Sequence, residues 1–216
     1  SVLKLSTEPG LELRVDGTDK LVLSRGEDPL LTLHATTFGI ALVEAIDEDL
    51  NYDPSYLEPG QFGDFLYEEP SGLRWIYPSQ LIQTTLKDGV LRSVLDYGDE
   101  GQAELRAKVD GNGRFALTWK PLSLNSVPVM FRLSPHCDSA EGFYGLGEYF
   151  DQVEHRGKVR TMHFVPAELE SGHNEAHVPI PLLLGTRGWG LFIESLRPMA
   201  FALATESDDQ FRATVG

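Results

Sequence analysis

The sequence predicts an all-β protein built as a large antiparallel β-sandwich. Short runs of apolar, β-branched and aromatic residues recur along the whole chain, with Gly, Pro, Asn and Asp between them. No stretch keeps a helical period for three turns, and residues 44–50 favour one short helical turn at most. So many short strands at this spacing are typical of two large sheets packed face to face.

The expected strands follow one another in three groups along the chain. The first group is residues 11–15, 20–23, 31–34 and 39–46; the second is 73–77, 81–86, 90–95, 103–109 and 114–119; the third is 127–133, 180–184, 190–194, 201–204 and 211–215. Between residues 105 and 109 apolar and charged side chains alternate, which is the period of a half-buried strand. Asp88-Gly89 and Asp110-Gly111-Asn112-Gly113 predict the turns of two hairpins.

The length of the chain allows one large all-β domain or two small ones, and we expect a single domain that spans residues 1–216. The chain is 41% hydrophobic and 24% charged, which suffices for a buried core. Its formal net charge is −15, from 33 acidic and 18 basic residues. Because such a surface repels phosphate backbones and anionic lipids, we expect neither a nucleic-acid partner nor a membrane partner.

Cysteine usage fits a reducing compartment, or a bacterial chain that does not rely on disulfides. Cys137 is the single cysteine, so no intrachain disulfide can form. No apolar run reaches the ~18 residues of a membrane helix, and no signal peptide opens the chain. We therefore expect a cytoplasmic location, with Cys137 as a packing residue.

The segment from Gly26 to Leu73 is acidic and rich in aromatic residues. It contains no Lys or Arg, and prolines interrupt regular structure over residues 51–71, where Tyr52 and Tyr56 lie among the acids. A long aromatic loop of this kind is either a functional or interface segment or a loop packed on its own domain, and both interpretations stay open.

Two glycines interrupt the strand pattern at Phe143–Glu148. Gly145 and Gly147 flank Leu146, and glycine inside a strand marks a bulge or a close approach of another backbone. The pair lacks the third glycine and the following helix of a dinucleotide-binding loop. No cofactor is therefore predicted here.

A polar segment follows these glycines, from Asp151 to His177. It contains four of the six histidines, and His173 and His177 have the i, i+4 spacing of a helical zinc site. Ser171-Gly172 and Val178-Pro179 argue against a helix, so no metal is predicted. We expect the segment to bind hydroxyl-rich ligands or to line a neighbouring pocket through His155, Arg156, His173, Asn174 and His177.

Glu148 and Asp151 are the acidic residues nearest the glycines. Glycoside hydrolysis needs two carboxyl groups ~5–10 Å apart, but 33 acids leave the choice of a pair open. Both residues are candidates for contacts with a sugar, and structural hydrogen bonds that fix the bulge are the alternative. No residue of this chain is assigned a catalytic role.

The stretch from Phe143 to Ala204 closely resembles the N-terminal β-sandwich domain of glycoside hydrolase family 31, which includes α-glucosidases and α-xylosidases. The resemblance rests on Tyr144–Glu148, the Arg156-Gly157 pair, Ile180-Pro181 and Gly188–Phe192. It implies a galactose mutarotase-like sandwich that precedes a catalytic (β/α)8 barrel, with the segment 151–177 reaching over the sugar pocket. His177 and Leu182 depart from the family, whose members usually carry a tyrosine and an aromatic residue at these positions.

The family's two catalytic aspartates act by a retaining double displacement and lie in the barrel, which this sequence does not contain. The resemblance therefore implies a domain that packs on a barrel, lends it a loop, and is not catalytic alone. The alternatives are a free-standing carbohydrate-binding module that uses Tyr52, Tyr56 and the His-rich segment, and an aldose 1-epimerase that uses His34 or His136.

Overall fold

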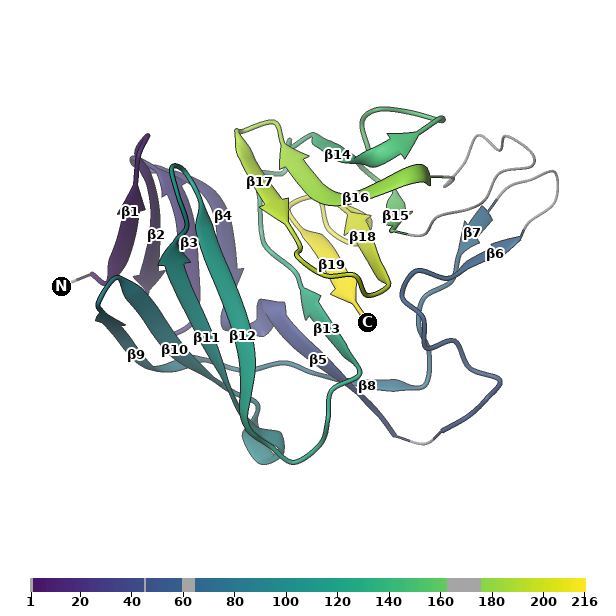
Figure 1. The fold of residues 1–216 in the computed structure, drawn as a ribbon, viewed down its shortest axis with the longest axis horizontal. Coiled ribbons are helices and arrows are strands. Elements are labelled where there is room, and N and C mark those ends of the chain that lie inside the picture. Colours follow the sequence, from purple (N-terminus) through teal and green to yellow (C-terminus); the bar gives the residue numbers. More distant parts are fainter. Residues whose placement is uncertain (1, 45, 60–64, 163–175) are drawn as a thin grey trace. The chain divides into compact units, whose positions relative to one another are not determined.

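The computed structural model describes residues 2–44, 46–59, 65–162 and 176–216, and only the backbone of residues 58, 59, 65, 66 and 177 (Figure 1). These ranges are strands and loops apart from two 3-10 helices, Ala35–Thr37 (η1) and Gly98–Glu100 (η3). The predicted all-β class is thereby confirmed. Within the same ranges no helix has the length and apolar character to span a bilayer.

The chain divides into two compact units. Unit 1 comprises residues 1–42 and 75–128, and unit 2 comprises residues 43–74 and 129–216. Unit 2 holds 21 Asp and Glu against 8 Lys and Arg, a formal charge of −13, whereas unit 1 holds 12 against 10, a charge of −2. The acidity of the chain is therefore a property of unit 2.

Unit 1 contains two four-stranded antiparallel sheets. The first has the order β1-β2-β3-β4, with β1 at Lys4–Thr7, β2 at Leu11–Asp16, β3 at Lys20–Arg25 and β4 at Asp28–His34. The second has the order β12-β11-β10-β9, with β9 at Leu81–Lys87, β10 at Val90–Asp96, β11 at Gly101–Val109 and β12 at Phe115–Leu124. Strands β5 (Phe38–Val43) and β8 (Leu73–Ile76) are hydrogen-bonded to each other.

The predicted hairpin turns of unit 1 are confirmed. Lys87 pairs with Val90, and both intervening residues have positive φ, 51° at Asp88 and 73° at Gly89, as a two-residue turn of right-handed twist requires. The turn between β11 and β12 is closed by a hydrogen bond from Asp110 N to Arg114 O, 2.9 Å.

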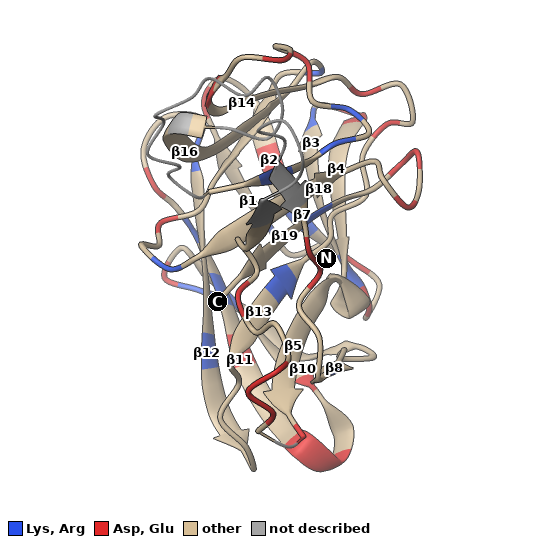
Figure 2. Ribbon diagram, turned by 90° about the vertical axis from the view of Figure 1, so that its right-hand side faces the viewer, with Lys and Arg blue, Asp and Glu red and all other residues tan. Residues whose placement is uncertain are grey.

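The alternation predicted for residues 105–109 is present over most of the strand. Leu105 and Ala107 are buried, whereas Arg106 and Lys108 are exposed, and Val109 is exposed where the strand ends. Basic residues on β11 and β12 are coloured blue in Figure 2. The opposite face of β11, which carries Leu105 and Ala107, forms part of the core of unit 1.

Unit 2 contains two further sheets and a short hairpin. One sheet runs β15-β18-β19-β13, with β15 at Val159–Thr161, β18 at Met199–Leu203, β19 at Phe211–Val215 and β13 at Met130–Leu133. The other runs β14-β16-β17, with β14 at Phe143–Tyr149, β16 at Ala176–Gly185 and β17 at Trp189–Phe192. The hairpin joins β6 (Leu57–Pro59) to β7 (Phe65–Tyr67).

Aromatic residues from both sheets form the core of unit 2. Trp189 of β17 stacks on Phe211 of β19, with ring centroids 5.1 Å apart and planes at 8°. Phe143 of β14 meets both rings edge to face, 6.4 and 5.8 Å between centroids. Such pairs stabilise a core beyond the burial of their area, so the start of β14 is held firmly.

Candidate functional site

The Gly145-Leu146-Gly147 segment of β14 approaches the backbone of β16 closely. All three residues lie in the left-handed region, with φ of 92°, 63° and 101°. A Cβ at Gly145 would collide with the carbonyl oxygen of Leu182, and one at Gly147 with that of Val178. The register between β14 and β16 shifts on both sides of Gly147. The predicted bulge and close approach are therefore confirmed, and Leu146 is driven into the core, fully buried.

A buried cation organises the chain just beyond β14. Arg160 is 0% exposed, and its NH2 donates to Asp151 Oδ1 at 2.7 Å. Its Nε donates to Nδ1 of His155 at 3.2 Å, and its guanidinium lies 4.3 Å above the Tyr149 ring. Arg160 therefore connects Asp151 and His155, two residues that the sequence proposed for the site.

The hydrogen bonds of His155 assign its tautomer. Because Nδ1 accepts from Arg160, the proton lies on Nε2, which is 3.0 Å from the carbonyl oxygen of Gly145 and donates to it. Burial lowers the pKa of His155, and the neighbouring charge of Arg160 acts in the same direction. His155 is therefore a neutral structural partner of the glycine bulge in this arrangement.

Asp151 remains ionised well into the acid range. Burial acts to raise its pKa, but the hydrogen bond and the positive charge of Arg160 outweigh it, so the pKa lies below its ordinary value. Lys158 Nζ lies 3.7 Å from the other carboxylate oxygen. The carboxylate thus neutralises the buried guanidinium.

Arg156 binds the carbonyl oxygens of two other segments of the chain. Its NH1 donates to Glu141 O at 2.9 Å, and its NH2 donates to Ser139 O at 2.7 Å and Asp208 O at 2.8 Å. The guanidinium also lies 6.0 Å from the centre of the Phe143 ring. Arg156 therefore fixes the start of β14 and the turn before β19.

Glu141 is a buried acid that sequence reasoning missed. Its carboxylate accepts from Thr186 Oγ1 at 2.9 Å, Arg187 N at 2.8 Å and Trp189 Nε1 at 2.9 Å. The side chain is thus saturated by donors from the turn between β16 and β17. Glu141 lies three positions before Tyr144, but no local pattern marks it, since its partners lie more than forty residues away.

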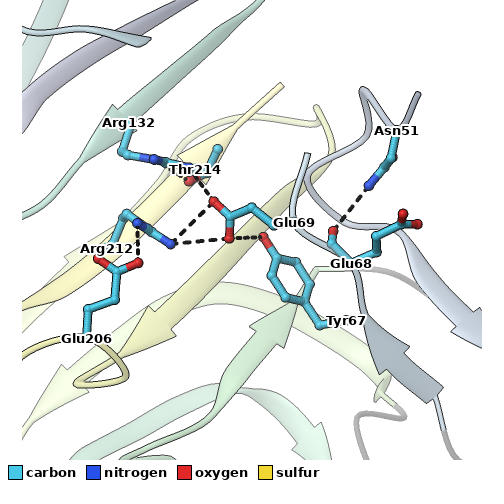
Figure 3. Close-up of polar contacts among 8 residues, drawn as sticks. All are labelled: Asn51, Tyr67, Glu68, Glu69, Arg132, Glu206, Arg212 and Thr214. Carbon is cyan, nitrogen blue, oxygen red and sulfur yellow. Dashed lines mark hydrogen bonds and ion pairs between the residues drawn. The ribbon is translucent and has the colours of Figure 1, made fainter. Parts of the chain in front are cut away.

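A second polar network fastens the acidic segment to unit 2 (Figure 3). Glu69 Oε1 accepts from Arg132 NH2 at 3.0 Å, and both carboxylate oxygens lie 3.3–3.4 Å from NH2 of Arg212. Arg132 is buried and also donates through Nε to Thr214 Oγ1 at 3.1 Å. The segment after β7 is therefore anchored on β13 and β19, in accord with the interpretation that it packs on its own domain.

The remaining predicted site residues divide into two groups. Glu148 is exposed on β14. His173 and Asn174 lie outside the described residues, and His177 is described only as backbone within β16. The structure thus brings together Asp151 and His155 through Arg160, and Arg156 joins them at the base of the same segment.

The candidates for metal ligation and acid–base chemistry can be located within the described ranges. No group of three or more His, Cys, Asp or Glu there could hold a metal ion. His34 lies 3.7 Å from Asp19 in unit 1 and His136 lies 3.6 Å from Asp209 in unit 2, each with a partly exposed side chain. Burial raises the pKa of Cys137 to about 12, with Glu141 adding to the effect, so the thiol is unreactive near neutrality.

Comparison with known proteins establishes the family. The model of the glycosyl hydrolase 31 N-terminal galactose mutarotase-like domain matches residues 7–201. The chain belongs to this family. The resemblance drawn from Tyr144–Glu148 and the residues after it is confirmed.

Individual relatives are distant and much longer. The isomaltosyltransferase of Sporosarcina globispora is 25% identical over 154 residues, which are 70% of this chain and 13% of that protein. A family 31 sulfoquinovosidase from E. rectale, solved with an aza-sugar inhibitor, superposes with a TM-score of 0.61 at 13% identity, over 94% of this chain and 30% of that one. The second similarity shows the fold alone. The chain therefore spans less than a third of either relative.

Proposed function

We propose that the chain serves as the N-terminal domain of a family 31 glycoside hydrolase of α-glucosidase or α-xylosidase type. It packs on a catalytic (β/α)8 barrel and lends a loop to the sugar site, while two aspartates of the barrel carry out a retaining double displacement. The family match and the much greater length of both relatives support this proposal. They favour it over a free-standing carbohydrate-binding module. Alone, the chain is catalytically silent.

Two further expectations belong to the same proposal. The sheets belong to a large antiparallel sandwich, which the family match over residues 7–201 supports. The protein works in the cytoplasm, which the single cysteine supports.

The observation that carries the proposal is an exposed apolar face on the β14-β16-β17 sheet. Tyr144 pairs with Leu184 across the first two strands, and Leu182 pairs with Phe192 across the second two. Tyr144, Leu184 and Phe192 are all exposed, Phe192 by 60%. Cross-strand neighbours on one face form a continuous surface. A contiguous apolar surface of this kind marks a protein contact.

The sugar-site part of the proposal rests on what precedes the loop. Asp151, His155 and Arg160 lock the start of the segment to the bulge of β14, and Arg156 locks it to the neighbouring turns. These buried contacts fix the segment where it leaves β14. Glu148, His173, Asn174 and His177 are then the residues expected to contact the sugar.

The first experiment tests catalysis. The 216-residue chain and the longer enzyme that carries it are assayed on nitrophenyl α-glucoside and α-xyloside. We expect turnover from the longer enzyme alone. Turnover by the isolated chain would overturn the proposal, since its reactive carboxylates would then lie here.

The second experiment tests docking. The chain and the remaining part of the enzyme are produced as separate polypeptides, and their association is measured. Phe192→Asp and Leu184→Asp should weaken it about tenfold or more, because each places a charge in an apolar contact. Leu117→Asp on β12 of unit 1, also at an exposed leucine, is the matched control. Equal losses for all three variants would contradict a contact through β14, β16 and β17.

A further inference from the structure

Unit 1 contains an open groove on the side of β9. Its volume is about 740 Å³, within the range of small-ligand sites. It is lined by Val2, Leu3, Val15, Asp16, Gly17, Thr18 and residues 80–84. Three segments far apart in the sequence thus meet here: the chain before β1, the turn between β2 and β3, and β9. In Figure 1 these elements lie in the part of the fold that carries the label N.

The groove presents polar groups above an apolar floor. Val15, Leu81 and Ile82 supply apolar surface, and Leu81 is almost fully buried. The side-chain amides of Gln80 and Gln83 make no hydrogen bond within the part of the chain that the structure describes, and both residues are exposed. These two uncommitted amides, one just before β9 and one within it, offer paired donors and acceptors to a ligand.

The backbone of Gln83 is held in an unusual conformation. Its φ is 51°, in the left-handed region that residues other than glycine, asparagine and aspartate rarely adopt. The register between β9 and β10 shifts at this point, so that Thr85 pairs with Arg92 and Ile82 with Val94. A bulge re-aims a side chain, and strain of this kind gathers at functional sites. Here the bulge and the positive φ occur at Gln83, a residue that lines the groove.

The lining selects the chemical class of the ligand. No Lys or Arg lines the groove, and Asp16 adds a carboxylate that is paired at 3.4 Å with Lys20 outside it. Phosphates and carboxylates therefore find no counter-charge. No aromatic ring lines it either, so a nucleobase has nothing to stack on. Amides, a hydroxyl and a carboxylate over aliphatic carbon instead match vicinal hydroxyl groups on a saturated ring.

We propose that this groove of unit 1 binds a neutral polyhydroxylated ligand, a mono- or disaccharide, at a site separate from the β14 segment. Gln80 and Gln83 hydrogen-bond adjacent hydroxyl groups, and Asp16 and Thr18 hydrogen-bond the opposite edge of the ring. Val15 and Ile82 contact its carbon atoms. The inference does not depend on the proposed function, since none of its residues lies in unit 2.

The test follows amide chemical shifts of the ¹⁵N-labelled chain during titration with maltose, isomaltose and glucuronate. We expect residues 16–18 and 80–84 to shift with the neutral sugars and not with glucuronate. Gln80→Ala and Gln83→Gly should each weaken binding about threefold to tenfold, the effect of one lost hydrogen bond. Gln83→Gly keeps the left-handed backbone, because glycine adopts positive φ freely, so its thermal midpoint should equal or exceed that of the unmodified chain.

Gln102→Ala, on β11 and outside the groove lining, is the matched control and should leave the titration unchanged. Absence of shifts at residues 16–18 and 80–84 with ~100 mM sugar would overturn the inference, since that concentration exceeds the dissociation constant of any useful site. A dissociation constant that is unchanged in both groove variants would overturn it as well. Shifts confined to residues 144–160 would overturn it and leave the proposed function standing.

Discussion

Arg160 Nε lies 3.2 Å from Nδ1 of His155, so a fully buried cation donates a hydrogen bond to a neutral imidazole. The same guanidinium binds the Asp151 carboxylate, and the imidazole binds the carbonyl oxygen of Gly145. One chain of hydrogen bonds thus runs from an acidic residue to the glycine bulge. Substitutions within this chain of hydrogen bonds should therefore lower the free energy of unfolding.

Removing the carboxylate should leave the buried guanidinium without its counter-charge. Asp151→Asn is expected to lower the free energy of unfolding by about 3 kcal/mol, the cost of breaking a buried pair. Urea denaturation at pH 7.5 measures it. Lys158→Met removes a partly exposed cation from the same carboxylate and should cost less than about 1 kcal/mol. Equal losses would contradict the central role of Arg160.

The lowered pKa of His155 makes stability depend on pH. The unfolded state, whose histidine has the ordinary pKa near 6.5, binds more protons than the folded state as the pH falls through and below that value. Stability should therefore fall with decreasing pH from about 6.5 downward, with a slope of at most ~1.4 kcal/mol per pH unit from this group.

The pH experiment compares urea denaturation of the unmodified chain and of His155→Gln between pH 7.5 and 5. The variant should lose that part of the slope, since glutamine does not titrate. Asp151 contributes separately, because its pKa is depressed and its stabilisation is lost only below its ordinary pKa near 3.9. An identical slope in both proteins would show that the pKa of His155 does not differ between the folded and unfolded states.

Gly147 and Gly157 form a matched pair of glycines with positive φ. Their φ angles are 101° and 76°, but a Cβ at Gly147 would collide with Val178 O, whereas nothing lies within 4 Å of one at Gly157. Gly157→Ala should cost about 1 kcal/mol from backbone strain. Gly147→Ala should cost about 3 kcal/mol or more, because β14 and β16 must separate. Thermal unfolding of both variants decides it, and similar midpoints would refute the close approach.

Glu69 should control the protection of the acidic segment. Glu69→Ala leaves the buried Arg132 without this carboxylate and should cost about 1–2 kcal/mol, discounted because Glu69 is itself half exposed. The amide of Ser71, which donates to Asn51 O at 2.7 Å, should then exchange with solvent faster. Glu206→Ala, which removes a more exposed partner of Arg212, is the control. Unchanged exchange at Ser71 would show that the segment is held by other contacts.

The local parts of this fold could be predicted from the sequence. Asp88-Gly89 predicted a hairpin turn, and the glycines around Leu146 predicted a bulge. Both predictions rest on the positive φ angles that glycine and aspartate adopt more readily than other residues. The alternation of apolar residues such as Leu105 and Ala107 with charged residues predicted a half-buried strand. Each of these signals lies within a few residues of its consequence.

The buried charges could not be predicted in the same way. Glu104 lies on the charged face of β11, yet it is 2% exposed because Arg92 and Arg106 both bind its carboxylate. Arg156 and Arg160 lie only four residues apart, but Arg160 is fully buried and Arg156 is not. Burial of such groups depends on partners brought together by the sheets. The contacts of His173, Asn174 and His177 with a sugar stay predictions.

The apolar face that includes Phe192 sets the solution behaviour of the separate chain. At neutral pH the formal charge of −15 makes copies of the chain repel one another, despite their exposed apolar surface. As acid brings the protein toward its isoelectric point near 4.7, or as salt screens the repulsion, those surfaces should meet one another and the chain should precipitate. Charge repulsion between copies therefore opposes aggregation of the separate chain. Once a catalytic barrel covers the apolar face, this repulsion is no longer needed.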